Sequence, residues 1–393
     1  MTQSTPSPAE VHRSAIVIDA HADTPQRFLD EGFDLASPRE GGDLNLDSIR
    51  EGNLAAEFFA IFVEPECYQG RFAHRALELI DALKRQVARH SDQVSFVTSA
   101  DGILAAHREG KFAALMGIEG GHAIEGSLAL LRIYHALGAR YMTLTWNNSN
   151  GWADSSGDID RPGISHTDNG LSEFGEQVVR EMNRLGMMVD ISHISDRAFH
   201  RVLAVSRAPV IASHSSTRAL CNAPRNLTDD MIRALAQSGG PLSGGGVMMV
   251  NFYSGFLSQQ YLDALKAIEP ECDRAVQQLK DQAATAGRPM PWDAIRQIKL
   301  SYANRIPRPP FSALIDHIDH AAKIAGVDHL GVGSDFDGVG GQLPEGIDSP
   351  ADLPKVTSAL MARGYKAGDC HKILGGNLLR VLYEVENIAR KLH

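Results

Sequence analysis

The segment VIDAHADTP (17–25) places His21 and Asp23 two residues apart at the end of an apolar run. Alternate residues of a strand point to the same side, so this imidazole and this carboxylate can lie together. One interpretation is a solvated strand end followed by a proline turn. The other is half of a metal site, because imidazole nitrogen and carboxylate oxygen are both zinc ligands. The second half of such a site must come from elsewhere in the chain.

Four more side chains of metal-binding type follow apolar runs elsewhere: Glu119, His193, His214 and Asp335. A single histidine at a strand end is more often a hydrogen-bonded core residue. Six such groups at one rim are not explained in that way, because carboxylates crowded away from water repel one another and lose hydration. Divalent cations between them remove that cost.

Six groups exceed the four ligands of one tetrahedral zinc but suit two metals about 3.5–4 Å apart. We expect two zinc ions, with manganese or iron as alternatives. One ion would have three of the ligands: His21, Asp23 and Glu119. The other would share the bridging Glu119 with the two remaining histidines, His193 and His214. Asp335 is left over and could take a proton from water that a metal has made acidic.

Eight short apolar runs could position these groups: 15–23, 55–63, 112–120, 141–146, 187–193, 209–214, 245–252 and 329–336. Strands that are apolar on both faces are typical of buried parallel sheets, and helical patterns such as 172–186 lie between the runs. This alternation predicts an α/β fold, a (β/α)8 TIM-type barrel. An open nucleotide-binding sheet is less favoured, because no glycine-rich phosphate loop follows the first run. Active sites of such barrels lie at the carboxyl ends of the strands, where all six groups fall.

The bulk properties set outer limits on function. The chain has 393 residues and a net charge of −10 without basic runs, which argues against nucleic acid or an anionic membrane as a partner. The start, MTQSTPSPAE, lacks signal-peptide features, and no apolar run could span a bilayer. We therefore expect a cytoplasmic location, with an already removed signal left open. We expect one domain over 1–393, with an N-terminal arm (1–14) and a helical insertion (254–310) that serves as a lid or a dimer contact.

Six motifs together resemble the renal (membrane) dipeptidase family of the amidohydrolase superfamily, in its bacterial form: IDAHAD, GIEGGHAI, VDISH, VIASHSS, APRNL and GSDFDG. The resemblance extends from about residue 15 to about residue 390. It implies a (β/α)8 barrel, a binuclear zinc centre with the five ligands named above, a homodimer and hydrolysis of dipeptides, often with a D-residue at the C-terminal position. It also implies that Asp335 transfers the proton and that Arg225 binds the terminal carboxylate of the substrate. Tyr253 is a weaker candidate for the same task.

The sequence departs from this family at Trp146, in LTW, where the family usually has a histidine that helps to polarise the scissile carbonyl. Indole donates one hydrogen bond but cannot become cationic. Loss of an oxyanion donor commonly costs about 10²–10³ in rate. Three explanations stay open. The metals could act unaided, another residue (His122, His166 or Asn147) could substitute, or the substrate could differ from the usual dipeptide.

The sequence therefore predicts a zinc-dependent dipeptidase that attacks small dipeptides, including L-Xaa-D-Xaa, with a metal-bridged hydroxide. One alternative is a binuclear metal hydrolase of N-acyl-amino acids or other small amides. A second alternative, favoured only by Trp146, is a non-catalytic metal-binding homologue.

Overall fold

The structure is a computed structural model that describes residues 6–38, 43–240, 243–287 and 292–392. Eight parallel strands form its centre: β1 (Val17–Ala22), β2 (Leu54–Phe62), β4 (Phe112–Glu119), β5 (Ala139–Thr143), β6 (Met188–Asp190), β7 (Ile211–Ser215), β8 (Val247–Val250) and β9 (Leu330–Val332). Hydrogen bonds connect them in the order β2-β1-β9-β8-β7-β6-β5-β4, and pairing of β2 with β4 closes the ring. The predicted (β/α)8 barrel is confirmed.

One further strand, β3 (Val94–Phe96), escaped the sequence analysis. It pairs with the first residues of β4, while β5 pairs with the later residues of β4. Three residues are too few to form a recognisable apolar run. The eight barrel strands were recognisable because they are apolar on both faces; every residue of β4 is buried, for example.

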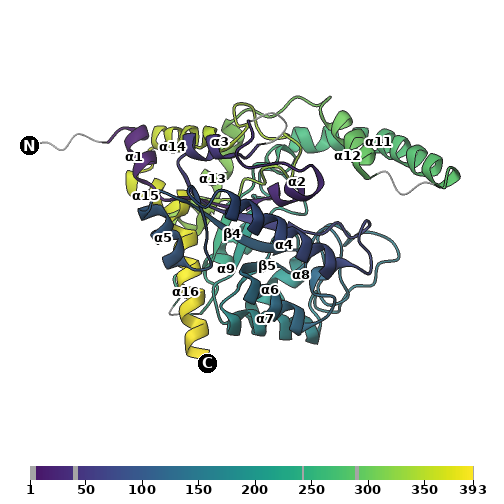
Figure 1. Cartoon of the computed structure of the whole chain (residues 1–393), viewed down its shortest axis with the longest axis horizontal. Coiled ribbons are helices and arrows are strands. Elements are labelled where there is room, and N and C mark those ends of the chain that lie inside the picture. Colours follow the sequence, from purple (N-terminus) through teal and green to yellow (C-terminus); the bar gives the residue numbers. More distant parts are fainter. Residues whose placement is uncertain (1–5, 39–42, 241–242, 288–291, 393) are drawn as a thin grey trace, which may run out of the picture.

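Helices surround the barrel (Figure 1). The main layer comprises α4 (Phe72–Arg89), α5 (Ala100–Arg108), α6 (Leu128–Leu137), α7 (Glu173–Leu185), α8 (Asp196–Val205), α9 (Asp229–Ala236), α13 (Ser312–Ala325) and α16 (Asn377–Leu392). Shorter or peripheral helices are α1 (Pro8–Ser14), α2 (Thr24–Asp30), α3 (Leu46–Glu51), α14 (Leu353–Ala362) and α15 (Ala367–His371). Their ends follow local chemistry. Ser172 caps α7 by accepting a hydrogen bond from the Gly175 nitrogen, and Gly186 ends that helix with φ 76°.

In its described residues the predicted insertion contains three helices: α10 (Ser254–Leu257), α11 (Gln259–Thr285) and α12 (Trp292–Ala303). The last two pack on each other through Cys272, Val276 and Ile295 and project from the barrel as an arm (Figure 1). Near its base, the Tyr261 hydroxyl donates to Gln342 Oε1 over 2.9 Å. Residues 288–291 lie outside the described parts. The role of this arm as a lid or a dimer contact stays a prediction.

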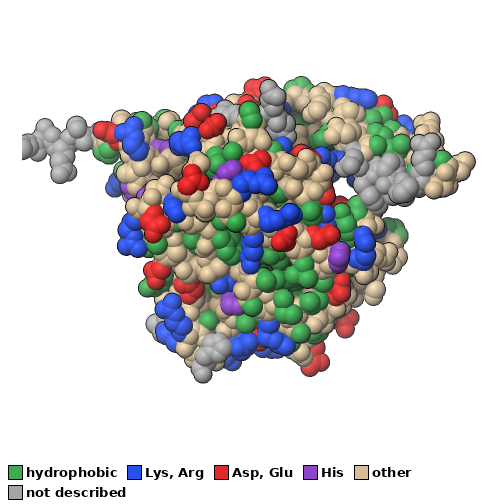
Figure 2. Space-filling model, in the orientation of Figure 1, with side chains coloured by type: hydrophobic (Ala, Val, Ile, Leu, Met, Phe, Trp, Pro, Cys, Tyr) green, Lys and Arg blue, Asp and Glu red, His purple; other side chains and the backbone are tan. Residues whose placement is uncertain are grey.

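The surface has a mixed charge. Basic and acidic side chains alternate on the face shown in Figure 2, and hydrophobic side chains gather between them over the region of α4 and α6. Leu77 on α4 and Ile133 on α6 are 42% and 47% exposed. Within the described ranges, no helix combines the length and the apolar character needed to cross a membrane.

Candidate metal centre

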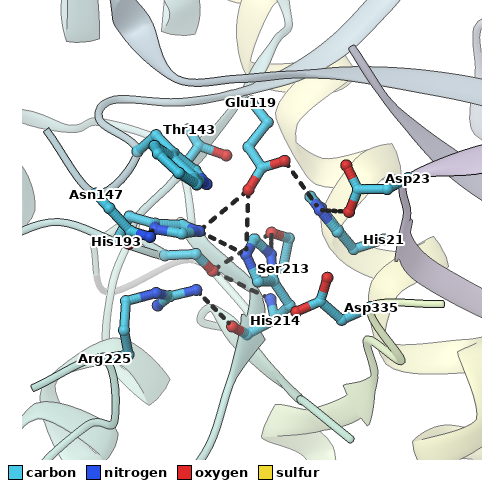
Figure 3. A network of polar contacts seen from close by, with 12 residues as sticks. His21, Asp23, Glu119, Thr143, Asn147, His193, Ser213, His214, Arg225 and Asp335 are labelled. Atoms are coloured by element: carbon cyan, nitrogen blue, oxygen red, sulfur yellow. Dashed lines mark hydrogen bonds and ion pairs between the residues drawn. The ribbon is translucent and has the colours of Figure 1, made fainter. Parts of the chain in front are cut away.

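All six predicted side chains lie together at the carboxyl ends of the strands (Figure 3). Three come from strand residues: His21 in β1, Glu119 at the end of β4 and His214 in β7. The other three lie in the loops just after β1, β6 and β9: Asp23, His193 and Asp335. β6 and β9 end three residues before His193 and Asp335, respectively. These two side chains are therefore positioned by turns and not by the strands.

Two of those turns have an unusual backbone. His193 has φ 68° and Asp335 has φ 65°, in the left-handed region that residues other than glycine rarely adopt. Such conformations typically cost about 1–3 kcal/mol and cluster at active sites. The fold therefore holds both side chains at the rim in spite of a local energetic cost.

The Glu119 carboxylate lies at the middle of the cluster. Its Oε2 is 3.3 Å from His21 Nε2. Its Oε1 is 3.1 Å from His193 Nε2 and 3.7 Å from His214 Nε2. The two oxygens of one carboxylate thus face different histidines, which is the arrangement that a bridging ligand requires.

A second carboxylate group lies on the His21 side. His21 Nε2 is 3.5 Å from Asp23 Oδ2, and ligand atoms of His21, Asp23 and Asp335 all lie within 4.8 Å of one another. The backbone at Gly338 packs closely against this pair. A Cβ atom there would lie 2.2 Å from Asp23 Oδ2 and 2.4 Å from Asp335 Oδ1. Only glycine leaves both carboxylates where they are.

The tautomers of the histidines determine which ring nitrogens have a lone pair that can bind a metal ion. Tyr141 Oη donates to the Ala20 carbonyl oxygen (3.2 Å), so it can only accept from His21 Nδ1 (2.8 Å). The His21 proton therefore lies on Nδ1, and its buried Nε2 has no hydrogen-bond partner among the described residues. His193 Nδ1 similarly donates to Asn147 Oδ1 over 2.9 Å. Its Nε2 then meets His214 Nε2 at 2.9 Å. The Ser213 hydroxyl donates to Asp190, so His214 Nδ1 must donate to Ser213, and two lone pairs would repel each other between the rings without a cation.

The electrostatics agree with this fit. Burial and the negative charge of Glu119 raise the pKa of Asp23 to about 7. Burial raises the pKa of Asp335 as well, with Glu119 contributing in the same direction. Burial and the charge of Arg225 lower the pKa of His193 to about 3, so its ring stays neutral. Burial lowers the pKa of His214 as well, whereas Tyr141 and Glu119 raise the pKa of His21 against the effect of its burial. Imidazole nitrogens beside carboxylates that repel one another form a donor set suited to divalent cations.

Arg225 lies beside the cluster and is buried. Its guanidinium donates to the His214 carbonyl oxygen over 3.2 Å, and its Cζ is 5.2 Å from the ring centroid of Phe256. Its Nε has no hydrogen-bond partner among the described residues. Burial lowers the pKa of Arg225 to about 10, so it remains charged at neutral pH. A buried guanidinium with a free donor is suited to bind a carboxylate.

Trp146 lies at the edge of the cluster. Its ring centroid is 6.2 Å from that of His193 and 4.7 Å from that of Phe62. Both Trp146 and Phe62 are half-buried, so they form an aromatic wall at the rim. The indole therefore lies next to the site, where the family resemblance placed a histidine.

The three proposed substitutes for that histidine differ in position. Asn147 contacts the cluster, because its Oδ1 accepts from His193. His122 donates through Nε2 to the Val63 carbonyl oxygen over 2.7 Å, and burial lowers its pKa. His166 lies in another loop, with Nδ1 3.9 Å from Asp154 Oδ1. Among the described residues, Asn147 is the one of these three that hydrogen-bonds to a ligand-type side chain.

Asn251, which the sequence analysis did not single out, supports Asp335 and Tyr253. Asn251 Nδ2 donates to Asp335 Oδ2 over 2.9 Å, and Asn251 Oδ1 accepts from the Tyr253 nitrogen over 2.6 Å. The Tyr253 ring lies 4.9 Å from Phe256, and burial raises its pKa, so its hydroxyl stays protonated. Tyr141 was also missed. No local sequence signal marks Asn251 or Tyr141, since both act through tertiary contacts.

Known proteins with a similar sequence support a single assignment. The family model described as membrane dipeptidase (peptidase family M19) matches residues 7–393. Dipeptidase 3 of Homo sapiens is 33% identical over 384 residues, which cover 96% of this chain and 67% of that protein. Dipeptidase 3 of Mus musculus is 33% identical over 350 residues, covering 89% and 59%. The chain thus spans only 59% to 67% of the length of these curated relatives.

Solved structures agree. The probable dipeptidase PvdM of Pseudomonas aeruginosa superposes with a TM-score of 0.82 at 28% identity, over 97% of this chain and 98% of that one. A metallo peptidase of Rhodobacter sphaeroides, bound to a phosphinate mimic of L-Ala-D-Ala, gives a TM-score of 0.74 at 25% identity, over 95% and 100%. These findings confirm the predicted family and enzyme class: the chain belongs to the membrane dipeptidase family of metallopeptidases.

Proposed function

We propose that this chain hydrolyses small dipeptides and holds two zinc ions side by side for that purpose. His21, Asp23 and Glu119 would bind one ion. Glu119, His193 and His214 would bind the other. The observation that carries the proposal is the Glu119 carboxylate, whose two oxygens face His21 on one side and the other two histidines on the other. Bound zinc would lower the pKa of a water molecule and polarise the peptide carbonyl.

Arg225 would bind the C-terminal carboxylate of the substrate, with Tyr253 as a weaker helper. Two features of Arg225 support this role: its burial and its unpartnered Nε. The Rhodobacter sphaeroides relative was solved with a mimic of L-Ala-D-Ala. We therefore propose L-Xaa-D-Xaa dipeptides as substrates. Trp146 and Phe62 would border the bound dipeptide.

Asp335 would act as general base and then as general acid. Asn251 holds one of its oxygens, Oδ2, while Oδ1 lies on the side of Gly338 and Asp23. Asp335 would take a proton from the attacking water and deliver it to the leaving amine.

A second candidate function follows from Trp146. An indole in place of a cationic donor would favour a different small amide, such as an N-acyl-amino acid, with the same metals. The test is turnover by zinc-loaded protein of L-Xaa-D-Xaa dipeptides, L-Xaa-L-Xaa dipeptides and N-acyl-D-amino acids, with metal content measured alongside. Preferred turnover of L-Xaa-D-Xaa supports the first proposal, preferred turnover of N-acyl-amino acids the second. Two bound metals without any turnover would contradict both and favour a non-catalytic homologue.

The family resemblance also leads us to propose a homodimer. Sedimentation analysis of the full chain tests this, and a purely monomeric protein at micromolar concentration would contradict it.

A further inference from the structure

A buried carboxylate lies behind the candidate metal centre and is outside its ligand set. Asp190, the last residue of β6, has no exposed surface. Its Oδ1 accepts hydrogen bonds from the backbone nitrogens of Ser192 (3.0 Å) and Ser213 (2.9 Å). Its Oδ2 accepts from the hydroxyls of Thr143 (2.6 Å) and Ser213 (2.5 Å). Four donors, from β5, β7 and the loop after β6, therefore hold this carboxylate in one position.

The Ser213 hydroxyl connects Asp190 to His214. A hydroxyl has a single proton, and here it points to Asp190 Oδ2. The same Ser213 oxygen lies 2.7 Å from His214 Nδ1 and can only accept a hydrogen bond there. The His214 ring proton must therefore lie on Nδ1, which leaves a lone pair on Nε2. That Nε2 faces Glu119 Oε1 at 3.7 Å and so points into the cluster (Figure 3).

In the other two histidines of the cluster, Nδ1 donates its hydrogen bond to an uncharged group. His21 Nδ1 donates to the Tyr141 hydroxyl, and His193 Nδ1 donates to the Asn147 amide oxygen. In the described parts of the chain, His214 alone among these three histidines is connected through a hydrogen-bonded hydroxyl to a carboxylate. A carboxylate behind an imidazole fixes its tautomer and makes the metal-binding nitrogen more basic.

We propose that Asp190 is a positioning residue for the metal centre. Acting through the Ser213 hydroxyl, it keeps the His214 proton on Nδ1 and strengthens Nε2 as a metal ligand. This inference rests on the proposed function, in which His214 binds zinc. Loss of such a support typically weakens metal binding by about 10- to 100-fold.

Three variants of the full chain test the connection. Ser213→Ala removes the hydroxyl but leaves Asp190 with three donors. Asp190→Asn removes the charge, and since four donors face this group, circular dichroism must show that the variant folds. Thr143→Val is the matched control, because it removes the other hydroxyl from the same Asp190 oxygen without interrupting the path to His214. Zinc affinity is measured by competition with a chromophoric chelator, and the tautomer of His214 by ¹⁵N NMR of the metal-free, histidine-labelled chain.

In the wild-type chain we expect the His214 proton on Nδ1. Ser213→Ala should weaken zinc binding about 10- to 100-fold, Asp190→Asn by a similar factor, and Thr143→Val much less. Wild-type affinity in Ser213→Ala, or a His214 proton on Nε2 in the wild-type chain, would overturn the inference. A wild-type chain that binds no zinc but carries the proton on Nδ1 would contradict the proposed function and support the hydrogen-bonded connection itself.

Discussion

Replacing Asp335 by asparagine separates proton transfer from metal binding. Asp335 Oδ2 accepts a hydrogen bond from Asn251 Nδ2 over 2.9 Å, and asparagine keeps an oxygen that can accept the same bond. The change exchanges a charge-assisted bond for a neutral one, at a cost of about 1 kcal/mol in folding free energy. Asparagine also tolerates the left-handed backbone at this position, where φ is 65°. The Asp335→Asn variant should therefore fold.

The catalytic effect should be far larger. General acid–base catalysis by one side chain typically contributes about 10²–10⁴ in rate, equivalent to about 3–5 kcal/mol of activation free energy. We expect kcat on the best dipeptide to fall by that factor. Zinc content should stay near two per chain, because the five proposed ligands are unchanged. Steady-state kinetics and elemental analysis of the same preparation measure both quantities.

Asp337 offers a matched control in the same loop. It also has a left-handed backbone, with φ 63°. Its carboxylate accepts from Thr24 Oγ1 (2.7 Å), from the Asp43 nitrogen (2.9 Å) and from the Arg27 guanidinium (3.3 Å), none of which is a proposed metal ligand. Because the ion pair with Arg27 is buried, circular dichroism must show that Asp337→Asn folds. Asp337→Asn should leave kcat close to the wild-type value. Near-normal kcat in Asp335→Asn would refute the assignment of the base, and zinc loss in step with activity would make Asp335 a ligand instead.

Three further predictions concern the substrate carboxylate, the carboxylate pair and stability. Arg225→Lys should raise KM for dipeptides about 10- to 100-fold, because Lys cannot form the two parallel hydrogen bonds of a guanidinium with a carboxylate. An equal rise in KM for dipeptide amides, which lack the C-terminal carboxylate, would contradict the role of Arg225 in binding that group. Gly338→Ala should lower zinc affinity, since its Cβ would collide with Asp23 and Asp335, and chelator competition that finds wild-type affinity would show the reasoning to be wrong. His317 accepts from the Thr217 nitrogen (3.0 Å), and burial lowers its pKa from 6.5 to about 4. As the pH falls, the unfolded chain therefore binds a proton at His317 before the folded chain does. The stability that neutral His317 contributes is complete above pH 6.5 and is lost towards pH 4, by up to about 3 kcal/mol. The free energy of urea unfolding should depend less steeply on pH in His317→Gln than in the wild type, and equal slopes would contradict this role of His317.

Much of the fold and of the cluster was predictable because both depend on local patterns. The barrel strands are apolar on both faces, and a histidine or carboxylate lies at or near the end of several of them. His21, Glu119 and His214 could be placed in this way. The proximity of all six groups follows from the barrel, because its strands end at one rim.

What could not be predicted depends on contacts between distant parts of the chain. Asp190 lies within the motif VDISH, but its link to His214 exists only where β6 and β7 are adjacent. Tyr141 reaches His21 because β4 has a glycine opposite: a Cβ at Gly117 would lie 2.1 Å from the Tyr141 ring. Neither effect leaves a periodic signal. The presence of Trp146 in place of the family's histidine was visible in the sequence, whereas the packing of Trp146 on Phe62 required coordinates.

Anomalous scattering at the zinc edge, from crystals of the zinc-loaded chain, tests the central claim most directly. We expect two peaks about 3.5–4 Å apart, one beside each oxygen of Glu119. One peak should contact His21 and Asp23, and the other should contact His193 and His214. A single peak, no peak, or a Glu119 side chain turned away from the histidines would contradict it.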